Sequence, residues 1–421
     1  MQKAKSYIIP LILITSLFFL WGFAHNLDPV LIPHLKRSFS LTTTQATLVD
    51  SALFIAYFFM ALPAGYIMKK WGYKIGIITG LLLFSLGSLL FVPAANFQSY
   101  NYFLIALFVI ACGLTILETA ANPYVSALGN PSNSTQKLNL AQSFNGLAVV
   151  LAPLLGEKYI LIQGHTDAEL DVMTESAKKV ALASEAASVK TPYIILAMVL
   201  LIVAALFYFI KLPDLRNKDE NNSNSILKTF RHRHLSWAVI AQFFYVGAQV
   251  SIFSLFIVYI NDAKIVTNLS PAKYASIAGL AFLIGRFAGT AFMKFIAPNK
   301  LLLIYSLIST ILCGIVIVGN GMMTIYALIG ICFFMSIMFP TIFSLGIKEL
   351  GADTEIASSL IVMSIVGGAV MPRFFGIISD ATGNIQLGYI VPLGCFMVVA
   401  YFGWKGYKVK TPPNNGGVLY N

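Results

Sequence analysis

Residues 123–129 read PYVSALG and residues 340–346 read PTIFSLG, so Pro, Leu and Gly recur at identical spacing. Two further pairs recur in the same order. FFLWG at residues 18–22 matches FFYVG at residues 243–247, and an Ala-Gly pair followed by a lysine five residues after the glycine occurs at residues 64–70 and again at 288–294. Helix-packing chemistry common to membrane proteins could repeat one such string. Three pairs in the same order indicate a duplicated unit.

The composition of the chain predicts an all-α membrane protein. Of 421 residues, 58% are hydrophobic and 11% are charged, whereas roughly a quarter of an average soluble domain is charged. Apolar runs recur along the chain, each close to the roughly 20 residues that cross a bilayer core. We expect twelve transmembrane helices, at residues 7–32, 44–68, 73–95, 101–127, 139–163, 192–211, 235–260, 270–294, 299–318, 322–347, 355–379 and 386–404.

The distribution of Lys and Arg predicts the orientation of these helices, because positive residues accumulate in cytoplasmic loops. Lys3 and Lys5 precede the first span, which lacks a cleavage site and is expected to be retained. With both termini cytoplasmic, eighteen basic residues lie inside and eight outside, and Arg286 and Arg373 lie within spans. The net charge of +11 is then explained by topology and anionic lipid, and no nucleic-acid partner is expected.

A polar stretch divides the chain into two halves. We expect an N-terminal six-helix bundle at residues 1–212, a cytoplasmic linker at 213–234, and a C-terminal six-helix bundle with a short tail at 235–421. A six-plus-six repeat about an axis along the membrane normal favours the major facilitator fold, in which the substrate site lies near mid-membrane between the halves.

Glu118 is the clearest candidate for chemistry. It lies deep in the fourth span, where a charge costs about 2.5 kcal/mol or more, and Asn122 shares its helical face one turn on. The repeat-equivalent position, five residues before Pro340, is Met335. An acid in one half alone suggests that the N-terminal half handles a coupling ion, whereas the alternative is an acid paired with a buried donor.

The first span adds a second set of candidates near its outer end. His25 and Asp28 are three residues apart on one face, and Asn26 lies between them. A His beside an acid can relay a proton, and a helix broken by Pro29 next to a carboxylate also suits a sodium ion. The alternative is that Asp28 is solvated at the helix mouth.

Further polar side chains recur at helical spacing. Gln142 and Asn145 in the fifth span, and Gln242 and Gln249 in the seventh, would bind substrate or hold helices together. Arg286 and Arg373 are expected near helix ends, where a long side chain can reach the membrane boundary. The four cysteines fall in apolar spans without metal-ligand spacing and are expected to be core residues, and no metal site is predicted.

The sequence contains no catalytic triad order, phosphate-binding loop or dinucleotide fingerprint. We therefore expect neither an enzyme nor an ATP-driven pump, and no organic cofactor. An ion gradient is the expected source of energy.

Several long strings resemble the fucose permease group of the major facilitator superfamily, whose members carry fucose, glucose, galactose or N-acetylglucosamine. They are LETAANPY at residues 117–124, LNLAQSFN at 138–145, AQFFYVGAQ at 241–249, IGRFAGT at 284–290 and PTIFSLGIK at 340–348. The resemblance implies a twelve-helix rocker-switch symporter with Glu118 as the proton-handling group near the sugar. It also places Asn26, Asn122, Gln142 and Asn145 in the substrate cavity. The group's acid in the first span falls at Pro29 here, one place after Asp28.

We accordingly predict a proton-coupled hexose symporter in a bacterial cytoplasmic membrane, with the sugar left open among those four. Glu118, Asp28 and His25 are the predicted coupling residues. The expected partners of the protein are the sugar, the coupling cation and membrane lipids, and we expect the protein to be a monomer. Sodium coupling, with Asp28 as an ion ligand, is the nearest alternative; a sugar sensor and an exporter of apolar drugs are two further ones.

Overall fold

The computed structural model describes residues 8–25, 35, 39, 48–128, 130–159, 172–174, 176–178, 181, 187, 189–210, 212–213, 226–262 and 269–409. Within these ranges, the side chains of residues 8–10, 24–25, 50, 149–150, 153–159, 227 and 262 are not described. The predicted linker is therefore described only at its two ends, and its boundaries remain a prediction.

Among the described residues, the N-terminal part of the chain forms six long helical rods. They are α1 (Ile8–His25), α4 (Leu48–Trp71), α5 (Tyr73–Leu89) with its continuation α6 (Phe91–Asn96), α7 (Tyr100–Ala127), α8 (Ser134–Tyr159) and α11 (Lys190–Phe209). A short helix, η1 (Pro131–Asn133), precedes α8.

The C-terminal part forms six more rods, preceded by the short α12 (Ile226–Thr229). They are α13 (Arg233–Asp262), α14 (Pro271–Phe292), α15 (Pro298–Val318), α16 (Met322–Met335) with α17 (Met338–Gly346), α18 (Thr354–Met363) with η3 (Ser364–Val366) and α19 (Gly367–Thr382), and η4 (Ile385–Tyr389) with α20 (Ile390–Tyr401) and η5 (Phe402–Gly406). Helix η2 (Gly351–Asp353) leads into α18.

The lengths and compositions of these rods suit a membrane. Ten of them, within the described residues, are long and apolar enough to cross one, and α1 contributes a shorter apolar stretch at Leu11–Phe23. In the remaining rod, α8, the apolar sequence is interrupted by the polar residues Asn139, Gln142 and Asn145. These polar side chains are tolerated because α8 lies between α1, α14 and α17. The prediction of an all-helical, multi-pass protein is confirmed.

Three of the predicted spans are interrupted. The helix breaks at Leu90 between α5 and α6, at Ser336 and Ile337 between α16 and α17, and α18 passes into α19 through the tight turn η3. Proline lies near two of these breaks, at Pro93 and Pro340; it lacks the N–H that would continue the helical hydrogen-bond pattern. Pro63 and Pro123 lie inside unbroken helices, so proline alone does not predict where a span breaks.

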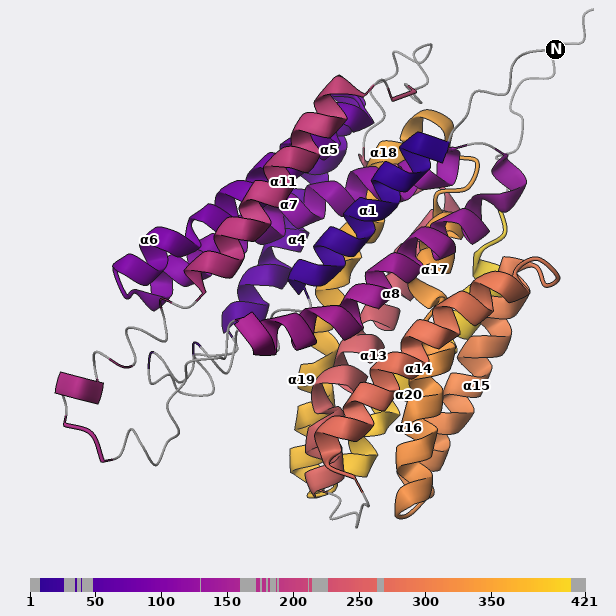
Figure 1. The fold of residues 1–421 in the computed structure, drawn as a ribbon. Coiled ribbons are helices and arrows are strands. Elements are labelled where there is room, and N and C mark those ends of the chain that lie inside the picture. Colours follow the sequence, from indigo (N-terminus) through magenta and orange to yellow (C-terminus); the bar gives the residue numbers. More distant parts are fainter. Residues whose placement is uncertain are drawn as a thin grey trace, which may run out of the picture.

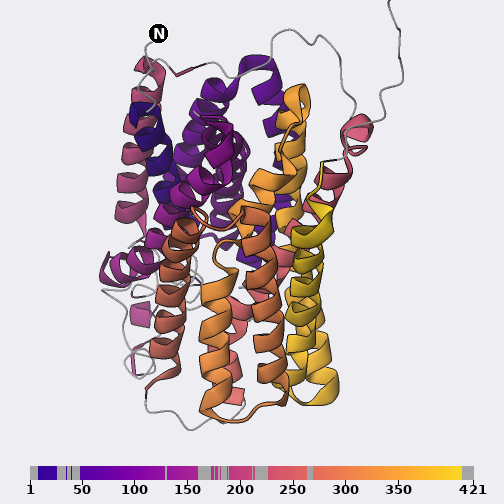
Figure 2. The same cartoon turned by 90° about the vertical axis from the view of Figure 1, so that its right-hand side faces the viewer.

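The helices form two groups that meet along one side of the molecule (Figure 1). We call the side with the turn at Gly72, helix α12 and helix η2 the linker side. The groups are in contact where α4 meets α18 and where α8 meets α14 and α17, and their far ends, such as those of α6 and α19, diverge. Figure 2 shows the two groups stacked when the molecule is turned by 90°.

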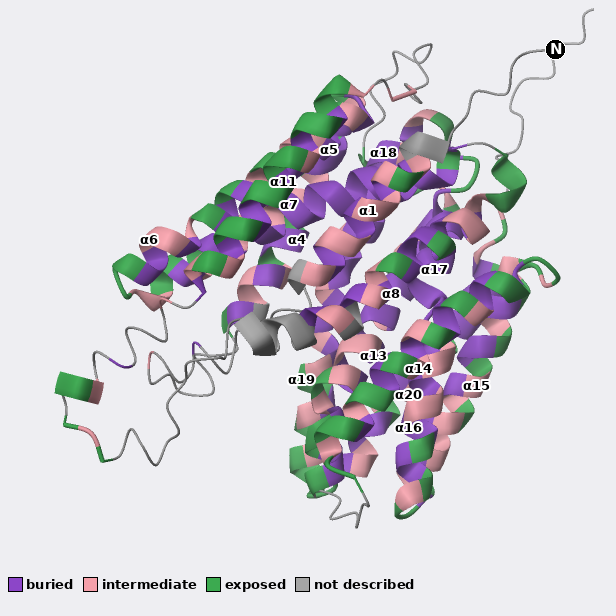
Figure 3. Ribbon diagram, viewed as in Figure 1, coloured by how far each residue is buried: buried purple, intermediate pink, exposed green. Residues whose placement is uncertain are grey.

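The exposed apolar residues lie on the outer faces of the rods. Figure 3 shows exposed positions on α5, α11 and α14, whereas α7 and α17 are largely buried. Examples are Leu82 on α5, Ile202 on α11 and Ile284 on α14, with exposed fractions of 48%, 59% and 51%. This distribution is that of a protein whose perimeter contacts lipid.

Helices α5 and α7 pack closely because glycine lies at their contact. A Cβ atom at Gly113 would lie 2.5 Å from the backbone N of Phe84 and 2.7 Å from the carbonyl O of Gly80. Both neighbours are main-chain atoms, so a side chain there would require the two helices to separate.

We predict that Gly113→Ala destabilises the protein by about 1–3 kcal/mol, because it overpacks this contact. A thermal melt of the purified protein in detergent would show a lower melting temperature than the parent. Gly314→Ala in α15 is the matched control, because a Cβ there meets no atom within 4 Å. Equal melting temperatures for the two variants would contradict the assigned packing.

Candidate functional site

Glu118 lies in the buried middle of α7, as predicted. Its exposed fraction is 9%, and every residue from Gly113 to Ser126 on this helix is buried. The side chain of Tyr57, on α4, is a hydrogen-bond partner of the Glu118 carboxyl group. The second carboxyl oxygen, Oε2, has no partner among the described residues. A carboxyl group with a spare acceptor inside a membrane protein can take a proton or a ligand hydroxyl.

The predicted amides lie next to this acid. Asn122 follows Glu118 by one helical turn, and the Gln142 amide Nε2 donates to the Asn122 Oδ1 at 3.1 Å. Both side chains are buried, and the Asn122 amide nitrogen has no partner in the described part of the chain. Helices α7 and α8 thus bring an acid and two amides together, with a free donor and a free acceptor.

Arg286 reaches this cluster from α14, in the other group of helices. Its Nε donates to the Ser336 carbonyl at 3.0 Å, and its Nη1 donates to the Gln142 carbonyl and, at 3.4 Å, to Asn145 Oδ1. The guanidinium also lies 4.6 Å from the centre of the Phe282 ring and interacts electrostatically with Glu118. The expectation that Arg286 reaches the membrane boundary is therefore wrong, because its exposed fraction is 4%.

The break between α16 and α17 supplies the carbonyls on the C-terminal side of the site. The Ser336 carbonyl accepts a hydrogen bond from Arg286 Nε, and the Met335 carbonyl accepts one from the Tyr245 hydroxyl at 3.1 Å. Tyr245, on α13, also interacts electrostatically with Arg286. Gln242 and Gln249 lie three residues before and four residues after it, on the same face of α13. Gln242 is fully buried, and neither polar atom of its side chain has a described partner.

Helix α1 packs against the site at Asn145. A Cβ at Gly22 would lie 2.6 Å from the Asn145 side-chain nitrogen, and His25 ends α1 one turn later. The His25 side chain, and Asn26 and Asp28 altogether, lie outside the described residues. Their predicted roles remain predictions.

A row of polar contacts joins the two groups of helices on the linker side of Gln142. Asn139 Nδ2 donates to Thr341 Oγ1 at 3.2 Å, and the hydroxyls of Thr135 and Ser344 are 2.9 Å apart. Helices α4 and α18 also approach closely, because a Cβ at Gly65 would meet Ser359 Oγ at 1.9 Å. The cluster around Glu118 is therefore closed off from the linker side.

The two groups part on the opposite side. A Cβ at Gly368 would lie 2.6 Å from the Phe54 ring, so α4 and α19 still touch there. Beyond this contact a cavity of about 370 Å³ separates them. It is lined on one side by Ser51, Phe54 and Ile55 and on the other by Val366, Ala369, Val370, Arg373, Phe374 and Ile377. This cavity contains none of the predicted site residues.

Some members of the cluster carried no recognisable sequence signal. Tyr57 lies in the run AYFFM, where nothing distinguishes it from the neighbouring aromatic residues. Asn139 and Tyr245 are equally ordinary within LNLAQ and FFYVG. Arg286 did carry a signal, because a lone arginine inside an apolar span is rare and functional by default. Among the described residues, no group of three His, Cys, Asp or Glu could hold a metal ion.

Comparison with known proteins matches the chain to the Major Facilitator Superfamily over residues 12–354. It is 43% identical to the L-fucose-proton symporter of Escherichia coli (strain K12) over 409 residues, covering 95% of this chain and 93% of that protein. It is 37% identical to the glucose/galactose transporter of Brucella abortus over 410 residues, covering 97% and 96% of the two chains. The crystal structure of the superfamily transporter FucP in the outward conformation superposes with a TM-score of 0.88 at 42% identity, covering 95% of this chain and 99% of that one.

We predict that Arg286→Lys lowers the stability of the protein by about 2 kcal/mol or more. A single ammonium group cannot reproduce the planar fork that binds the Gln142 and Ser336 carbonyls from two directions. Thermal melts of the purified variant would measure the loss. Arg373→Lys is the matched control, because no hydrogen bond or ion pair joins Arg373 to the rest of the described chain. An unchanged melting temperature for Arg286→Lys would show that the described contacts do not stabilise the closed linker side.

Proposed function

The chain belongs to the Major Facilitator Superfamily, within the group of the L-fucose-proton symporter, and from this premise we propose that it takes up a hexose together with a proton by alternating access. The observation that carries the proposal is the buried Glu118 with an unpaired oxygen, beside the amides of Asn122 and Gln142. The relatives with 43% and 37% identity are a fucose-proton symporter and a glucose/galactose transporter.

The chemistry of the cluster suits a sugar. Each sugar hydroxyl both donates and accepts a hydrogen bond, and each side-chain amide offers two donors and one acceptor oxygen. Asn122 and Gln142 form one hydrogen bond with each other, and the Asn122 amide nitrogen remains available as a donor. We assign substrate contact to Asn122, Gln142, Asn145, Gln242 and Gln249, and to Asn26 from the sequence.

The same cluster suits coupling to a proton. A buried carboxylate is costly unless it is paired, whereas the protonated acid is neutral and can donate to a sugar hydroxyl. When the proton leaves, the carboxylate and Arg286 attract each other across the two groups of helices. Glu118 therefore changes the electrostatic balance at the contact that must open and close, and we assign the coupling role to it, with Asp28 and His25 as further candidates.

Alternating access requires that the closed side open. We place the linker side in the cytoplasm, because the basic residues of the described loops gather there, among them Lys69, Lys70, Arg231, Arg233 and Lys300. The structure, closed on this side and parted on the other, would then be outward-open, and a relative of high structural similarity is described in the outward conformation. The proposal includes a bacterial inner membrane, cytoplasmic termini, and bundles at residues 1–212 and 235–421 joined by a cytoplasmic linker.

The direct test is uptake of radiolabelled fucose, glucose, galactose and N-acetylglucosamine into proteoliposomes. A proton gradient and a sodium gradient are imposed separately. Accumulation driven by the proton gradient alone supports the proposal. Accumulation driven only by sodium would show that sodium is the coupling ion and would favour an ion site near Asp28. Absence of uptake for all four sugars would refute the proposed function.

We predict that Glu118→Gln abolishes accumulation of the sugar against a gradient but retains exchange of labelled for unlabelled sugar. The amide keeps the shape of the side chain but cannot titrate. Counterflow and proton-driven uptake in the same proteoliposomes separate the two activities. Glu349→Gln is the control, because that side chain is 62% exposed and pairs with neighbouring Lys348. Full accumulation by Glu118→Gln would remove it from the coupling site.

We further predict that the double variant Thr135→Cys with Ser344→Cys forms a disulfide that stops transport. The two hydroxyl oxygens are 2.9 Å apart across the groups of helices, so the two side chains are in direct contact. Oxidation should lock the linker side closed, and reduction should restore uptake. Either single variant controls for the substitutions, and undiminished uptake by the fully cross-linked protein would contradict the proposed opening of this side.

A further inference from the structure

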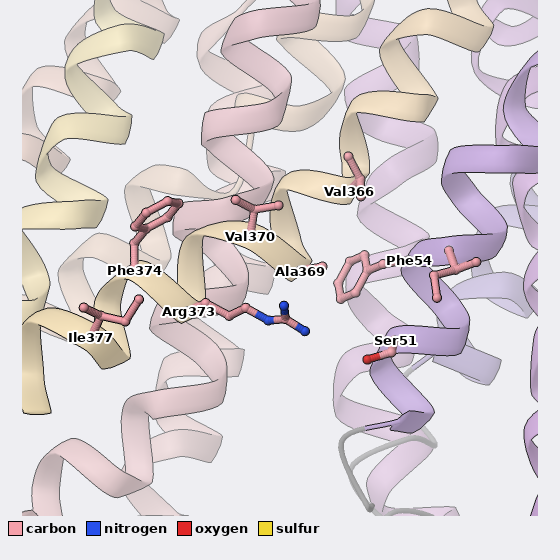
Figure 4. Close-up of a pocket in the computed structure, with 9 residues that line it drawn as sticks. Ser51, Phe54, Val366, Ala369, Val370, Arg373, Phe374 and Ile377 are labelled. Carbon is pink, nitrogen blue, oxygen red and sulfur yellow. The ribbon is translucent and has the colours of Figure 1, made fainter. Parts of the chain in front are cut away.

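The cavity between α4 and α19 lies apart from the cluster around Glu118. It has a volume of about 370 Å³ and lies on the side of the molecule opposite the linker. Figure 4 shows α19 and α4 facing each other across it, with Phe374 and Ile377 on one wall and Phe54 and Ser51 on the other. The two walls belong to different groups of helices, so the cavity exists only while those groups are parted on this side.

Arg373 is the one charged residue of this lining. Its side chain leaves α19 and its guanidinium projects into the gap toward α4 (Figure 4). The residue is exposed, and within the described chain no hydrogen bond or ion pair engages it. This contrasts with Arg286, whose guanidinium donates to the carbonyls of Ser336 and Gln142 and lies over an aromatic ring. Such a cation in a membrane-spanning helix is costly unless an anion or water meets it.

The position of Arg373 along α19 fits contact with a lipid headgroup. It lies nine residues before Thr382, where the helix ends on the side opposite the linker, which is about 14 Å along the axis. An extended arginine side chain covers about half of such a distance. The guanidinium extends across the gap toward α4 (Figure 4), so an anionic headgroup would meet it inside the outer part of the gap.

The rest of the lining is apolar. Phe374 and Ile377 are 50% and 62% exposed, and Ile55 on the facing helix is 48% exposed. Ser51 is the only other polar residue of the lining. A path for a hydrated sugar would need a wall of donors and acceptors like that around Asn122. A single cation over apolar walls matches an amphiphile with an anionic head and hydrocarbon chains instead.

We propose that an anionic phospholipid binds between α4 and α19, with its phosphate on Arg373 and an acyl chain against Phe54, Phe374 and Ile377. In the proposed topology this lipid belongs to the outer leaflet. Because closing the gap would bring α4 and α19 together, the bound lipid favours the parted, outward-open state. Anionic lipid would thus regulate the conformational equilibrium of the transporter without touching the sugar.

The test uses the full-length protein carrying Phe374→Trp, in lipid nanodiscs that contain either brominated phosphatidylglycerol or brominated phosphatidylcholine. Bromine quenches tryptophan at short range, and the parent protein, with its four native tryptophans, supplies the background. We expect phosphatidylglycerol to occupy the site about fivefold more readily than phosphatidylcholine. This is the preference that the attraction of one basic residue for anionic lipid produces. Adding Arg373→Gln should abolish this preference, and Arg373→Lys should retain most of it.

Lys294→Gln is the matched control, since it removes an exposed charge at the end of α14 on the linker side. It should leave the preference unchanged. Equal quenching by the two lipids with Arg373 intact would overturn the proposal. Relief of quenching by inorganic phosphate would also overturn it, because the site would then take a soluble anion. No sugar is present in this assay, so its outcome is independent of whether the protein transports a hexose.

Discussion

The contact of Arg286 with α8 is the interaction on which the architecture of the site depends. A guanidinium inside a membrane protein must be surrounded by acceptors, since leaving it unpaired costs several kcal/mol. Gly146 on α8 lies beside Arg286: a Cβ there would be 3.4 Å from Arg286 Cδ. The bond from Arg286 to the Gln142 carbonyl fixes where α8 sits against α14. The Gln142 side chain then reaches Asn122 and the neighbourhood of Glu118.

The closed linker side also shows how a repeated sequence takes two packing roles. Gly65 and Gly289 are equivalent in the repeat, yet Gly65 faces Ser359 across the two groups of helices, whereas Gly289 faces Ile337 within its own group. At α14 the contact between the groups is made instead by Arg286 and by Thr290, whose carbonyl accepts from Gln136. The repeat preserves the small residue that close approach requires. Which helix makes that approach is decided by the rest of the interface.

Much of this arrangement could be predicted from the sequence, because the membrane restricts the possibilities. A chain with recurrent apolar runs must form helices, and a lone Glu118 in such a run must face an interior. Tyr57 could not be predicted, since its role depends on the distance between α4 and α7 and not on any spacing along the chain. The buried orientation of Arg286 was missed for a related reason: one of the two carbonyls that accept from it belongs to Ser336, at the break between α16 and α17. Hydropathy does not report such a break, because all the residues around it remain apolar.

The difference between Glu118 and its repeat-equivalent residue Met335 has a physical consequence. In the N-terminal half, the position five residues before the repeated proline carries a carboxyl group on an unbroken helix, α7. In the C-terminal half, the equivalent residue is the last of α16, and the polar contacts come from the main chain: Met335 and Ser336 offer their carbonyls to Tyr245 and Arg286. Both halves thus present oxygen atoms around the same cation, but a carbonyl has a fixed partial charge and a carboxyl group can gain or lose a proton. In the proposed mechanism, protonation of Glu118 weakens the attraction of Arg286 toward α7 and leaves the bond from Arg286 to Ser336 untouched, so the balance between the two halves changes with the charge of this side chain.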